Sequence, residues 1–535
     1  MEAGKNRRSF LGACLAGGAT ASSLPAKAQS VAATRPHGTF NVQDLGAAAT
    51  GQVLDTKALQ SAIDAAGQSG GVVYFPPGTY LAGRLTLRSH VSLHLESGAM
   101  LLGSTNLADY PPVQPALRSY TDTYTNQSLI YGENLEDVSL LGRGTLNGQG
   151  GSFKRAEDYG NRPYLIRLVN CRHVQVADLT LLDSSMWVQH YLACEDVAIQ
   201  NLTVHSRCNA NNDGIDIDAC EKVRISGCEV VSGDDAIVLK STIDRPCRDV
   251  TVTNCVVSSL CNALKLGTES VGGFQNVAIS NCTVYDTHLA GIALETVDGG
   301  GLENVTVSNI VMHNVQGAIF LRLGNRARPI YEGAPRPGLG SFRNVMITNV
   351  QATGADVTGC AIAGQPERAL ENVTLSNIRV QFAGGGTQAD AAREVPDLPT
   401  SYPEYKMFGK LPAYGFYCRH VKNLRLLDAQ VTFAREDLRP ALVCEDVAGL
   451  RISDFAAPNS SPVIVLRDTR DAWLEGNRAP QGNHVYLRLE GAQVENIAIA
   501  ANDLRASKKP VDLGPGVGAG VVLASAPMKP YQGEL

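Results

Sequence analysis

The chain has 535 residues, of which 46 are Lys or Arg and 52 are Asp or Glu, giving a net charge of −6. Hydrophobic residues make up 44% of the chain, which is enough for a large core and excludes a mostly disordered protein. The acidic balance also excludes a basic nucleic-acid-binding protein, so we expect no nucleic-acid partner.

The N-terminus has the pattern of an export signal. Arg7 and Arg8 precede a mildly apolar run, which ends in small residues around Ala26 and Ala28. The arginine pair resembles the twin-arginine type of bacterial signal, so residues 1–28 are predicted to be a signal peptide and the protein to be periplasmic or secreted. No later stretch has 18 consecutive apolar residues, so no membrane association is predicted.

A short phrase recurs along the chain and predicts the fold. It begins with an Asn, Asp or Lys, continues with an alternating pair such as Val-x-Ile or Val-x-Val, and ends in a polar turn. The alternation indicates a half-buried strand, and a second strand series with the same period lies between the phrases. Strands repeated at a fixed period indicate a β-solenoid, and we expect an all-β, right-handed parallel β-helix. The phrase begins at Asp196, Lys222, Asp249, Asn276, Asn304, Asn344, Asn372 and Asn423.

Residues 29–125 are predicted to form an N-terminal cap and the first coils. Within them, apolar residues at helical spacing from Thr56 to Ala66 predict a helix that covers one open end of the solenoid. The main β-helix is predicted over 126–507, with insertions at 325–341 and 384–417, and a C-terminal tail over 508–535. Nine of the 13 cysteines recur in two columns, which predicts buried thiols in a packing ladder rather than a metal site, with disulfides as the alternative for an exported protein.

Three carboxylates are expected to meet on the outside of the solenoid. Asp213 precedes one strand of the second series, and Asp234 and Asp235 precede the next, 21 residues later. Crowded carboxylates raise at least one pKa. One protonated and one ionised carboxyl are what glycoside hydrolysis requires, while calcium binding and a solvated acidic rim are the alternatives.

The motif Asn211-x-Asp213, followed by Gly233-Asp234-Asp235, resembles the polygalacturonases of glycoside hydrolase family 28. The opening segment Tyr74-Phe-Pro-Pro-Gly-Thr-Tyr is similar to the start of this pectinase group. The resemblance implies an inverting hydrolase of pectin-type polysaccharide that needs no metal and no other cofactor. It further implies that Asp234 is the general acid and that Asp213 and Asp235 hold the attacking water.

Two family motifs are absent. Where the family has Gly-His-Gly, Asn262 stands in place of the His, and where it has Arg-Ile-Lys the chain reads Ala293-Leu-Glu295. A Glu in place of a cation repels a substrate carboxylate, so ordinary polygalacturonate is predicted to be a poor substrate. Other residues are expected to contact the substrate: Asn211, Lys240, Asn262, Lys265, Glu269, Glu295 and Arg322.

The two insertions favour a pocket-like groove and exo action on a polysaccharide or oligosaccharide, by a protein expected to be a monomer. The aromatic insertion around Tyr402 either stacks on sugar faces or packs as a structural loop. Two other functions stay open. One is a polysaccharide lyase on the same scaffold, in which the acids hold calcium. The other is a non-catalytic carbohydrate-binding solenoid.

Overall fold

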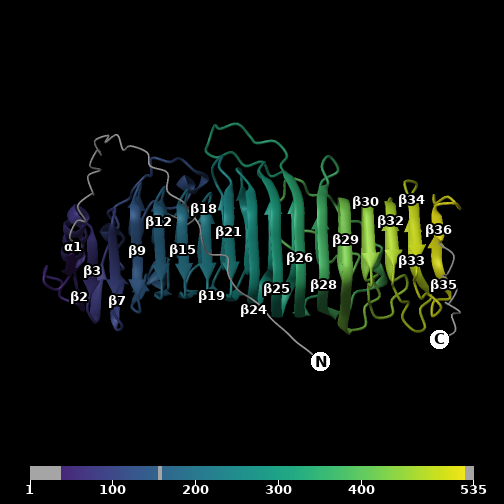
Figure 1. Cartoon of the computed structure of the whole chain (residues 1–535), viewed down its shortest axis with the longest axis horizontal. Coiled ribbons are helices and arrows are strands. Elements are labelled where there is room, and N and C mark those ends of the chain that lie inside the picture. Colours follow the sequence, from purple (N-terminus) through teal and green to yellow (C-terminus); the bar gives the residue numbers. More distant parts are fainter. Residues whose placement is uncertain (1–37, 155–159, 525–535) are drawn as a thin grey trace, which may run out of the picture. The chain divides into compact units, whose positions relative to one another are not determined.

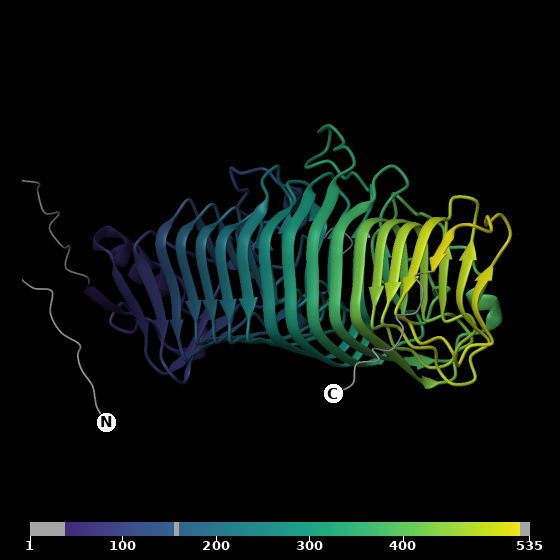
Figure 2. The ribbon, with the colours of Figure 1, turned by 45° about the vertical axis from the view of Figure 1, so that its right-hand side comes forward.

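The computed structural model describes residues 38–154 and 160–524. The predicted signal peptide at 1–28, and with it the export prediction, lies outside these residues. Parallel strands stack coil on coil along the long axis in Figures 1 and 2, which confirms the predicted right-handed parallel β-helix. Within the described ranges, no helix has the length and apolar character needed to cross a membrane.

The strands form three walls, and each strand pairs in parallel with its equivalents one coil before and one coil after. Wall 1 carries the recurring phrase, and wall 3 carries the second predicted strand series. Six long strands each run through more than one wall: β24 (Phe274–Thr296), β25 (Gly301–Leu323), β26 (Ser341–Ala355), β28 (Leu370–Gly384), β29 (Phe416–Arg435) and β30 (Leu442–Ser453).

The other strands of wall 1 are β1 (Gly38–Asn41), β3 (Gly71–Phe75), β6 (Val91–Leu95), β9 (Glu136–Gly142), β12 (Arg172–Ala177), β15 (Glu195–Gln200), β18 (Glu221–Ser226), β21 (Cys247–Thr253), β32 (Arg470–Glu475), β34 (Glu495–Ala500) and β36 (Val522–Ala524). Those of wall 2 are β2 (Thr50–Leu54), β4 (Gly78–Ala82), β7 (Ala99–Gly103), β10 (Thr145–Asn147), β13 (Thr180–Leu182), β16 (Thr203–Ser206), β19 (Glu229–Ser232) and β22 (Val256–Ser259). Those of wall 3 are β5 (Leu85–Thr86), β8 (Ser128–Glu133), β11 (Tyr164–Val169), β14 (Gln189–Leu192), β17 (Ile215–Asp218), β20 (Ile237–Ser241), β23 (Leu264–Ser270), β27 (Cys360–Ala363), β31 (Ile464–Arg467), β33 (Val485–Glu490) and β35 (Lys509–Leu513).

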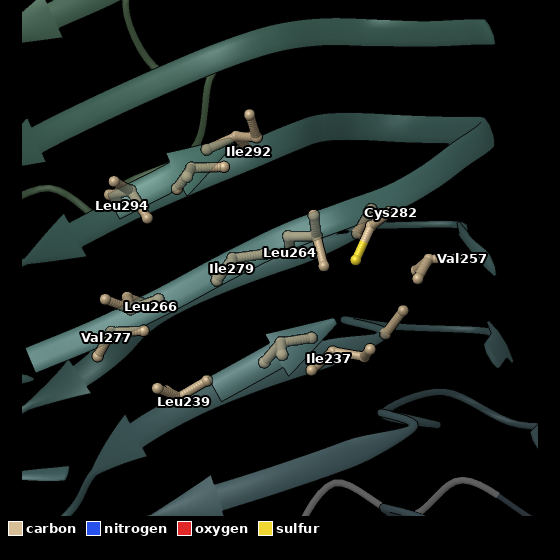
Figure 3. Close-up of a cluster of buried hydrophobic side chains, with 14 of the residues drawn as sticks. Ile237, Leu239, Val257, Leu264, Leu266, Val277, Ile279, Cys282, Ile292 and Leu294 are labelled. Atoms are coloured by element: carbon tan, nitrogen blue, oxygen red, sulfur yellow. The ribbon is translucent and has the colours of Figure 1, made fainter. Parts of the chain in front are cut away.

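The core consists of columns of apolar side chains that repeat from coil to coil. On wall 3, Ile237 pairs with Leu264, and Leu264 pairs with Ile292. Figure 3 shows these side chains pointing into the solenoid beside their equivalents from wall 1. The twelve cysteines that the structure describes are all free thiols, and ten of them are buried in the same hydrophobic core. Burial of aligned apolar side chains therefore fixes the register of each coil.

A ladder of Asn side chains marks the turn before wall 1. Its backbone is left-handed, with φ of 56° at Asn276 and 57° at Asn304, which Asn tolerates better than most residues. Each amide donates to the side chain one coil earlier, at 2.9 Å from Asn276 to Asp249 and 3.2 Å from Asn304 to Asn276. The ladder continues across both insertions, which therefore leave the coil register intact. It extends through Asn344, Asn372 and Asn423 at 2.9–3.2 Å.

Helix α1 (Thr56–Ser69) lies at the N-terminal end of the solenoid, where a helix was expected (Figure 1). It buries Leu59, Ala62, Ile63 and Ala66, and packs against β1, β3, β5 and β6. The other helices are short: α2 (Gln388–Ala391) and the 3-10 turns η1 (Leu107–Asp109), η2 (Tyr120–Thr123) and η3 (Gly150–Ser152).

The solenoid extends further toward the C-terminus than the sequence predicts. β35 pairs with β33, and β36 pairs with β34, so the predicted tail over 508–535 begins inside the sheet and its boundary is wrong. These last strands lack the recurring phrase and are more exposed, which is why their pattern is weak. The chain between β25 and β26 and the chain between β28 and β29 correspond to the two insertions.

Replacing Leu264 by Ala should lower the free energy of unfolding by roughly 2–5 kcal/mol, because a buried side chain is lost from the middle of a column. Val256→Ala is the matched control, since Val256 is 43% exposed on the neighbouring strand β22, and the change should be within about 0.5 kcal/mol. Urea unfolding of both variants measures this. Equal midpoints would contradict the assignment of Leu264 to the stabilising column.

Candidate active site

The three predicted acids meet at one point outside wall 3. Asp213 lies just before β17, and Asp234 and Asp235 lie just before β20, which pairs with β17 in register. Oxygen atoms of the three carboxylates lie within 4.8 Å of one another. Stacking of successive coils therefore produces the triad that the spacing predicted.

Asp234 and Asp235 share this patch because the chain bends between β19 and β20. The two residues lie in the connection rather than in a strand, so the alternation of side chains along a strand does not separate them. The bend is held by the carbonyl of Asp234, which accepts hydrogen bonds of 2.6 Å from the hydroxyls of Ser232 and Ser259. The backbone N–H of Asp235 donates to the Asp234 carboxylate at 2.9 Å.

The two adjacent acids have opposite electrostatic surroundings. Burial, and after it the charge of Asp235, raises the pKa of Asp234 above its usual value. Burial also opposes ionisation of Asp235, but nearby cations outweigh it and lower the pKa of that carboxyl. The nearest cation is Lys265, whose Nζ lies 2.9 Å from Oδ2, and the Asn262 amide donates to Oδ1 at 2.8 Å. Asp234 is therefore the better proton donor and Asp235 the better proton acceptor.

Asp213 shares a second cation with two further acids. Nζ of Lys240 lies 3.3 Å from Asp213, 3.5 Å from Asp216 and 3.7 Å from Glu269. Burial, followed by the charge of Asp234, raises the pKa of Asp213, and burial followed by the charge of Asp213 raises that of Asp216. Lys240 also lies 4.7 Å from the centre of the Trp187 ring. Both Lys240 and Lys265 are thus committed to acids, although both were expected to contact substrate.

Glu295 does not carry the repulsive charge that the sequence suggests. Its side chain is fully buried beside Lys265, with Nζ at 3.9 Å, and burial raises its pKa to about 8. A carboxyl with that pKa is mainly protonated at neutral pH. The predicted obstacle to an anionic substrate is therefore absent below that pH.

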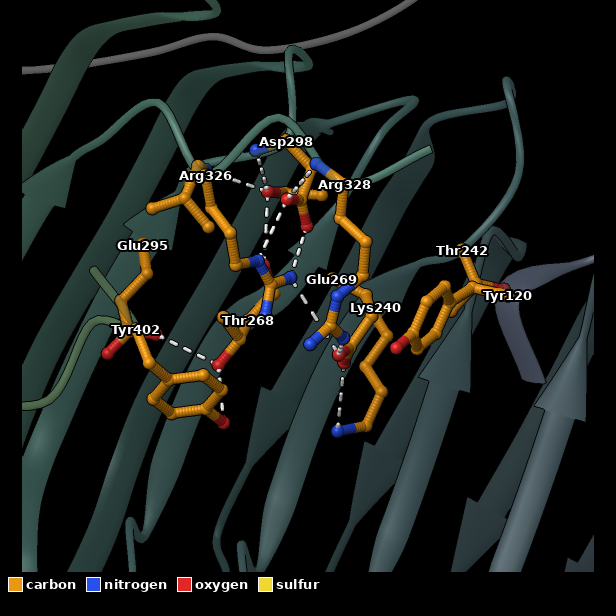
Figure 4. Close-up of polar contacts among 12 residues, drawn as sticks. Tyr120, Lys240, Thr242, Thr268, Glu269, Glu295, Asp298, Arg326, Arg328 and Tyr402 are labelled. Carbon is orange, nitrogen blue, oxygen red and sulfur yellow. Dashed lines mark hydrogen bonds and ion pairs between the residues drawn. The ribbon is translucent and has the colours of Figure 1, made fainter. Parts of the chain in front are cut away.

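Both insertions contribute residues to the site: two arginines that sequence reasoning missed, and the aromatic loop for which it left two roles open. The insertion after β25 supplies Arg326 and Arg328, which lie 3.8 Å and 3.0 Å from the Glu269 carboxylate. The insertion after β28 supplies Tyr402, whose ring is 51% exposed and whose hydroxyl lies 3.0 Å from that of Thr268. Figure 4 shows this cluster above the ends of the strands. The exposed ring favours the sugar-stacking alternative for the aromatic loop.

The second insertion also brings an acid toward the triad. Burial raises the pKa of Glu404 to about 7, with the charges of Asp235 and Asp234 acting in the same direction. The only signal for these insertion residues in the sequence was their place in long interruptions of the period, since no spacing relates them to the strands.

Two residues that were predicted to contact the substrate bond to other parts of the protein instead. Arg322 faces outward from wall 3 as expected, but the second insertion covers it and its guanidinium donates to the carbonyls of Gly364, Asp397 and Leu398. It is 1% exposed and does not join the triad. The side chain of Asn211 accepts a hydrogen bond from Arg162 at 2.9 Å, so it anchors the turn that leads to Asp213.

The triad oxygens are close enough to share a cation, as the lyase alternative requires. However, calcium takes six to eight oxygen ligands, and the ammonium groups of Lys240 and Lys265 already neutralise Asp213 and Asp235. The surroundings therefore suit proton transfer better than calcium binding. A groove of about 640 Å³ lies elsewhere, on wall 1 beside His90, Asp137 and His173, and none of the three acids lines it.

The chain matches the family model described as glycosyl hydrolases family 28 over residues 73–400. It is 30% identical over 391 residues to a protein named probable polygalacturonase from Vitis vinifera, covering 67% of this chain and 77% of the relative. It is 24% identical to an exopolygalacturonase from Platanus acerifolia, covering 65% of this chain and 92% of the relative.

Solved structures show the same fold. A family 28 exopolygalacturonase from Yersinia enterocolitica aligns with a TM-score of 0.57 at 20% identity, over 79% of this chain and 78% of that one. An exopolygalacturonase from Thermotoga maritima aligns with a TM-score of 0.56 at 24% identity, over 65% of this chain and 87% of that one.

Proposed function

Because the chain belongs to glycosyl hydrolases family 28 and is a glycoside hydrolase, we propose that it is an exo-acting enzyme on polysaccharides that contain galacturonate. The relatives named polygalacturonase and exopolygalacturonase support this substrate class. The observation that carries the proposal is the triad, in which adjacent carboxyls have pKa values shifted in opposite directions. Family membership does not favour the lyase or the binding solenoid.

In the proposed mechanism, Asp234 donates its proton to the glycosidic oxygen as the bond to the anomeric carbon breaks. Ionised Asp235 accepts a proton from a water molecule, whose oxygen forms the new bond to that carbon. Two carboxylate oxygens within 4.8 Å can both bond one water, since hydrogen bonds between oxygens are about 2.7–2.8 Å long. Asp213 is the second ligand of this water, and the anomeric configuration inverts.

Exo action is supported by where the insertions lie. Arg326 and Arg328 from one insertion and Tyr402 from the other lie in one cluster, at Glu269 and Thr268 of wall 3. Two loops that meet there obstruct the middle of a polymer more than a chain end. Time courses that release only monomer or dimer support exo action, whereas early release of mixed oligomers would contradict it.

Export to the periplasm or the medium is proposed from the N-terminal sequence alone, on the arginine pair Arg7 and Arg8. Expression in bacterial hosts with and without the twin-arginine pathway tests this. Recovery of a shortened protein outside the cytoplasm of both hosts would contradict the twin-arginine route.

Asp234→Asn should lower kcat by roughly 10²- to 10⁴-fold, because the amide cannot donate the proton to the leaving oxygen. Asp249→Asn is the control, since Asp249 lies in the turn ladder on wall 1, where Asn occupies the equivalent position in later coils. It should leave kcat unchanged. Near-normal turnover by folded Asp234→Asn would remove this residue from the mechanism.

Lys265→Gln should move the acidic limb of the pH profile of kcat upward by roughly one to two units. The folded enzyme holds the pKa of Asp235 below its usual value through Lys265, and activity requires the ionised carboxylate. Removal of the cation raises this pKa, so the base protonates at a higher pH. Lys222→Gln, which removes an exposed partner of Glu195 on wall 1, should leave the profile in place. An unchanged acidic limb in Lys265→Gln would show that Asp235 is not the titrating base.

Proton NMR of the first product formed should show the inverted anomer. The measurement is decisive because the triad oxygens lie closer than the roughly 6.5–9.5 Å usual for inverting pairs, and retaining pairs are about 5–5.5 Å apart. A retained configuration would exclude direct attack by water. It would instead require a nucleophilic carboxylate, for which Glu269 and Glu295 are the nearby candidates.

A further inference from the structure

A galacturonate carboxylate bound beside the triad needs a cation whose charge is not fully offset by carboxylates of the protein. The strand position where the family places Arg and Lys holds Ala293 and Glu295. Lys240 contacts three acids and is 4% exposed, and Lys265 contacts two and is 1% exposed. Arg322 lies under the second insertion. None of the cations on these wall 3 strands is therefore available to the substrate.

The insertion after β25 brings two arginines to the same cluster, and they differ in how firmly they are held. Nε of Arg326 donates to Asp298 at 2.9 Å, its Nη2 pairs with the same carboxylate, and its side chain is 9% exposed. Asp298 also accepts the backbone N–H of Arg328 at 3.0 Å. The Arg326–Asp298 pair therefore fixes the start of the insertion and positions its neighbour.

Arg328 differs from the other cations near the triad because its side chain is partly exposed. Its side chain is 29% exposed, and Nη1 donates to Glu269 at 3.0 Å. The guanidinium lies 4.2 Å from the centre of the Tyr120 ring, which holds its plane by stacking. Among the described residues, the guanidinium makes its hydrogen bond through Nη1 alone, and Nε and Nη2 make none. A planar guanidinium held in this way can donate two parallel hydrogen bonds to a carboxylate.

The charges around Arg328 favour an anion. Lys240, Arg326 and Arg328 surround Glu269, and within residues 38–154 and 160–524 these two arginines pair with one other acid, Asp298. Arg328 pairs with Glu269, and Glu269 pairs with Lys240 (Figure 4). Lys240 in turn lies 3.3 Å from Asp213 of the triad, so a series of ion pairs links Arg328 to the triad.

We propose that Arg328 binds the carboxylate of a uronic acid residue next to the scissile bond, and so determines specificity for the acidic over the esterified sugar. The inference rests on the proposed function, because it presupposes a substrate that contains galacturonate. It assigns to an insertion residue the task that strand residues perform in the family pattern, and it makes Arg326 and Asp298 positioning residues.

The test compares trigalacturonate with its methyl ester, which has the same backbone but no charge. Arg328→Gln should lower kcat/KM on trigalacturonate by about tenfold to a hundredfold, chiefly through KM, as loss of a charge-assisted hydrogen bond predicts. Activity on the ester should change less than about twofold. Arg328→Lys keeps the charge without the planar fork, so it should lie between wild type and Arg328→Gln on the acid.

Arg343→Gln is the matched control, because Arg343 is an exposed arginine paired with Glu303 at 2.7 Å on wall 1. It should leave both substrates unaffected. Equal losses on acid and ester in Arg328→Gln would mean that Arg328 only supports the loop, and no loss on the acid would mean that another group binds the carboxylate. Either result would overturn the inference while leaving the proposed function intact. If Arg328→Gln does not fold, the same comparison is made with Arg328→Lys, whose loss must be confined to the acid.

Wild-type enzyme that cleaves neither substrate, and no other galacturonate oligomer, would overturn the proposed function itself. Wild-type enzyme that prefers the ester to the acid would overturn the inference alone, because Arg328 would then give no advantage to the charged sugar.

Discussion

The site depends on the in-register pairing of parallel strands between successive coils. Residues at equivalent positions in neighbouring strands lie directly beside each other, whatever their chemistry. In the interior this aligns Ile237, Leu264 and Ile292 into a column that excludes water. At the surface the same pairing forces Asp213 against Asp234 and Asp235. The stability of the core thus holds three carboxylates at a spacing that they would not adopt by themselves.

The groups that stabilise negative charge in the triad act mainly on Asp235 and much less on Asp234. This difference gives the two carboxyls different roles in catalysis. Lys265 and the Asn262 amide both act on Asp235, whereas the nearest hydrogen-bond contacts of Asp234 are made through its backbone carbonyl and by the neighbouring N–H. Two chemically identical side chains, adjacent in sequence, therefore favour different protonation states. Asn262, which departs from the family motif, contributes to this division as a neutral hydrogen-bond donor.

Features that follow from the repeat period could be predicted from the sequence. The positions of residues in the two insertions could not, because the insertions interrupt the period. The strands, the Cys columns and the convergence of Asp213 with Asp234 and Asp235 all follow from residues repeated one coil apart. Arg328 and Tyr402 come from insertions whose conformation no repeat constrains, so their approach to the triad could not be read from spacing. The same loops explain why Arg322 is covered, and burial beside Lys265 explains why Glu295 lacks its expected charge.

The Asn ladder on wall 1 has a direction. Each amide from Asn423 back to Asn276 donates toward the N-terminal coil through Nδ2, and each one before Asn423 also accepts from the C-terminal coil through Oδ1. A chain of such dipoles polarises cooperatively, and it must begin with a group that accepts without needing to donate in return. Asp249 is that group, since its side chain accepts from Asn276 through Oδ1 and carries no amide donor. Its negative charge lies at the positive end of the row, so one side chain both ends the ladder and orients every amide above it.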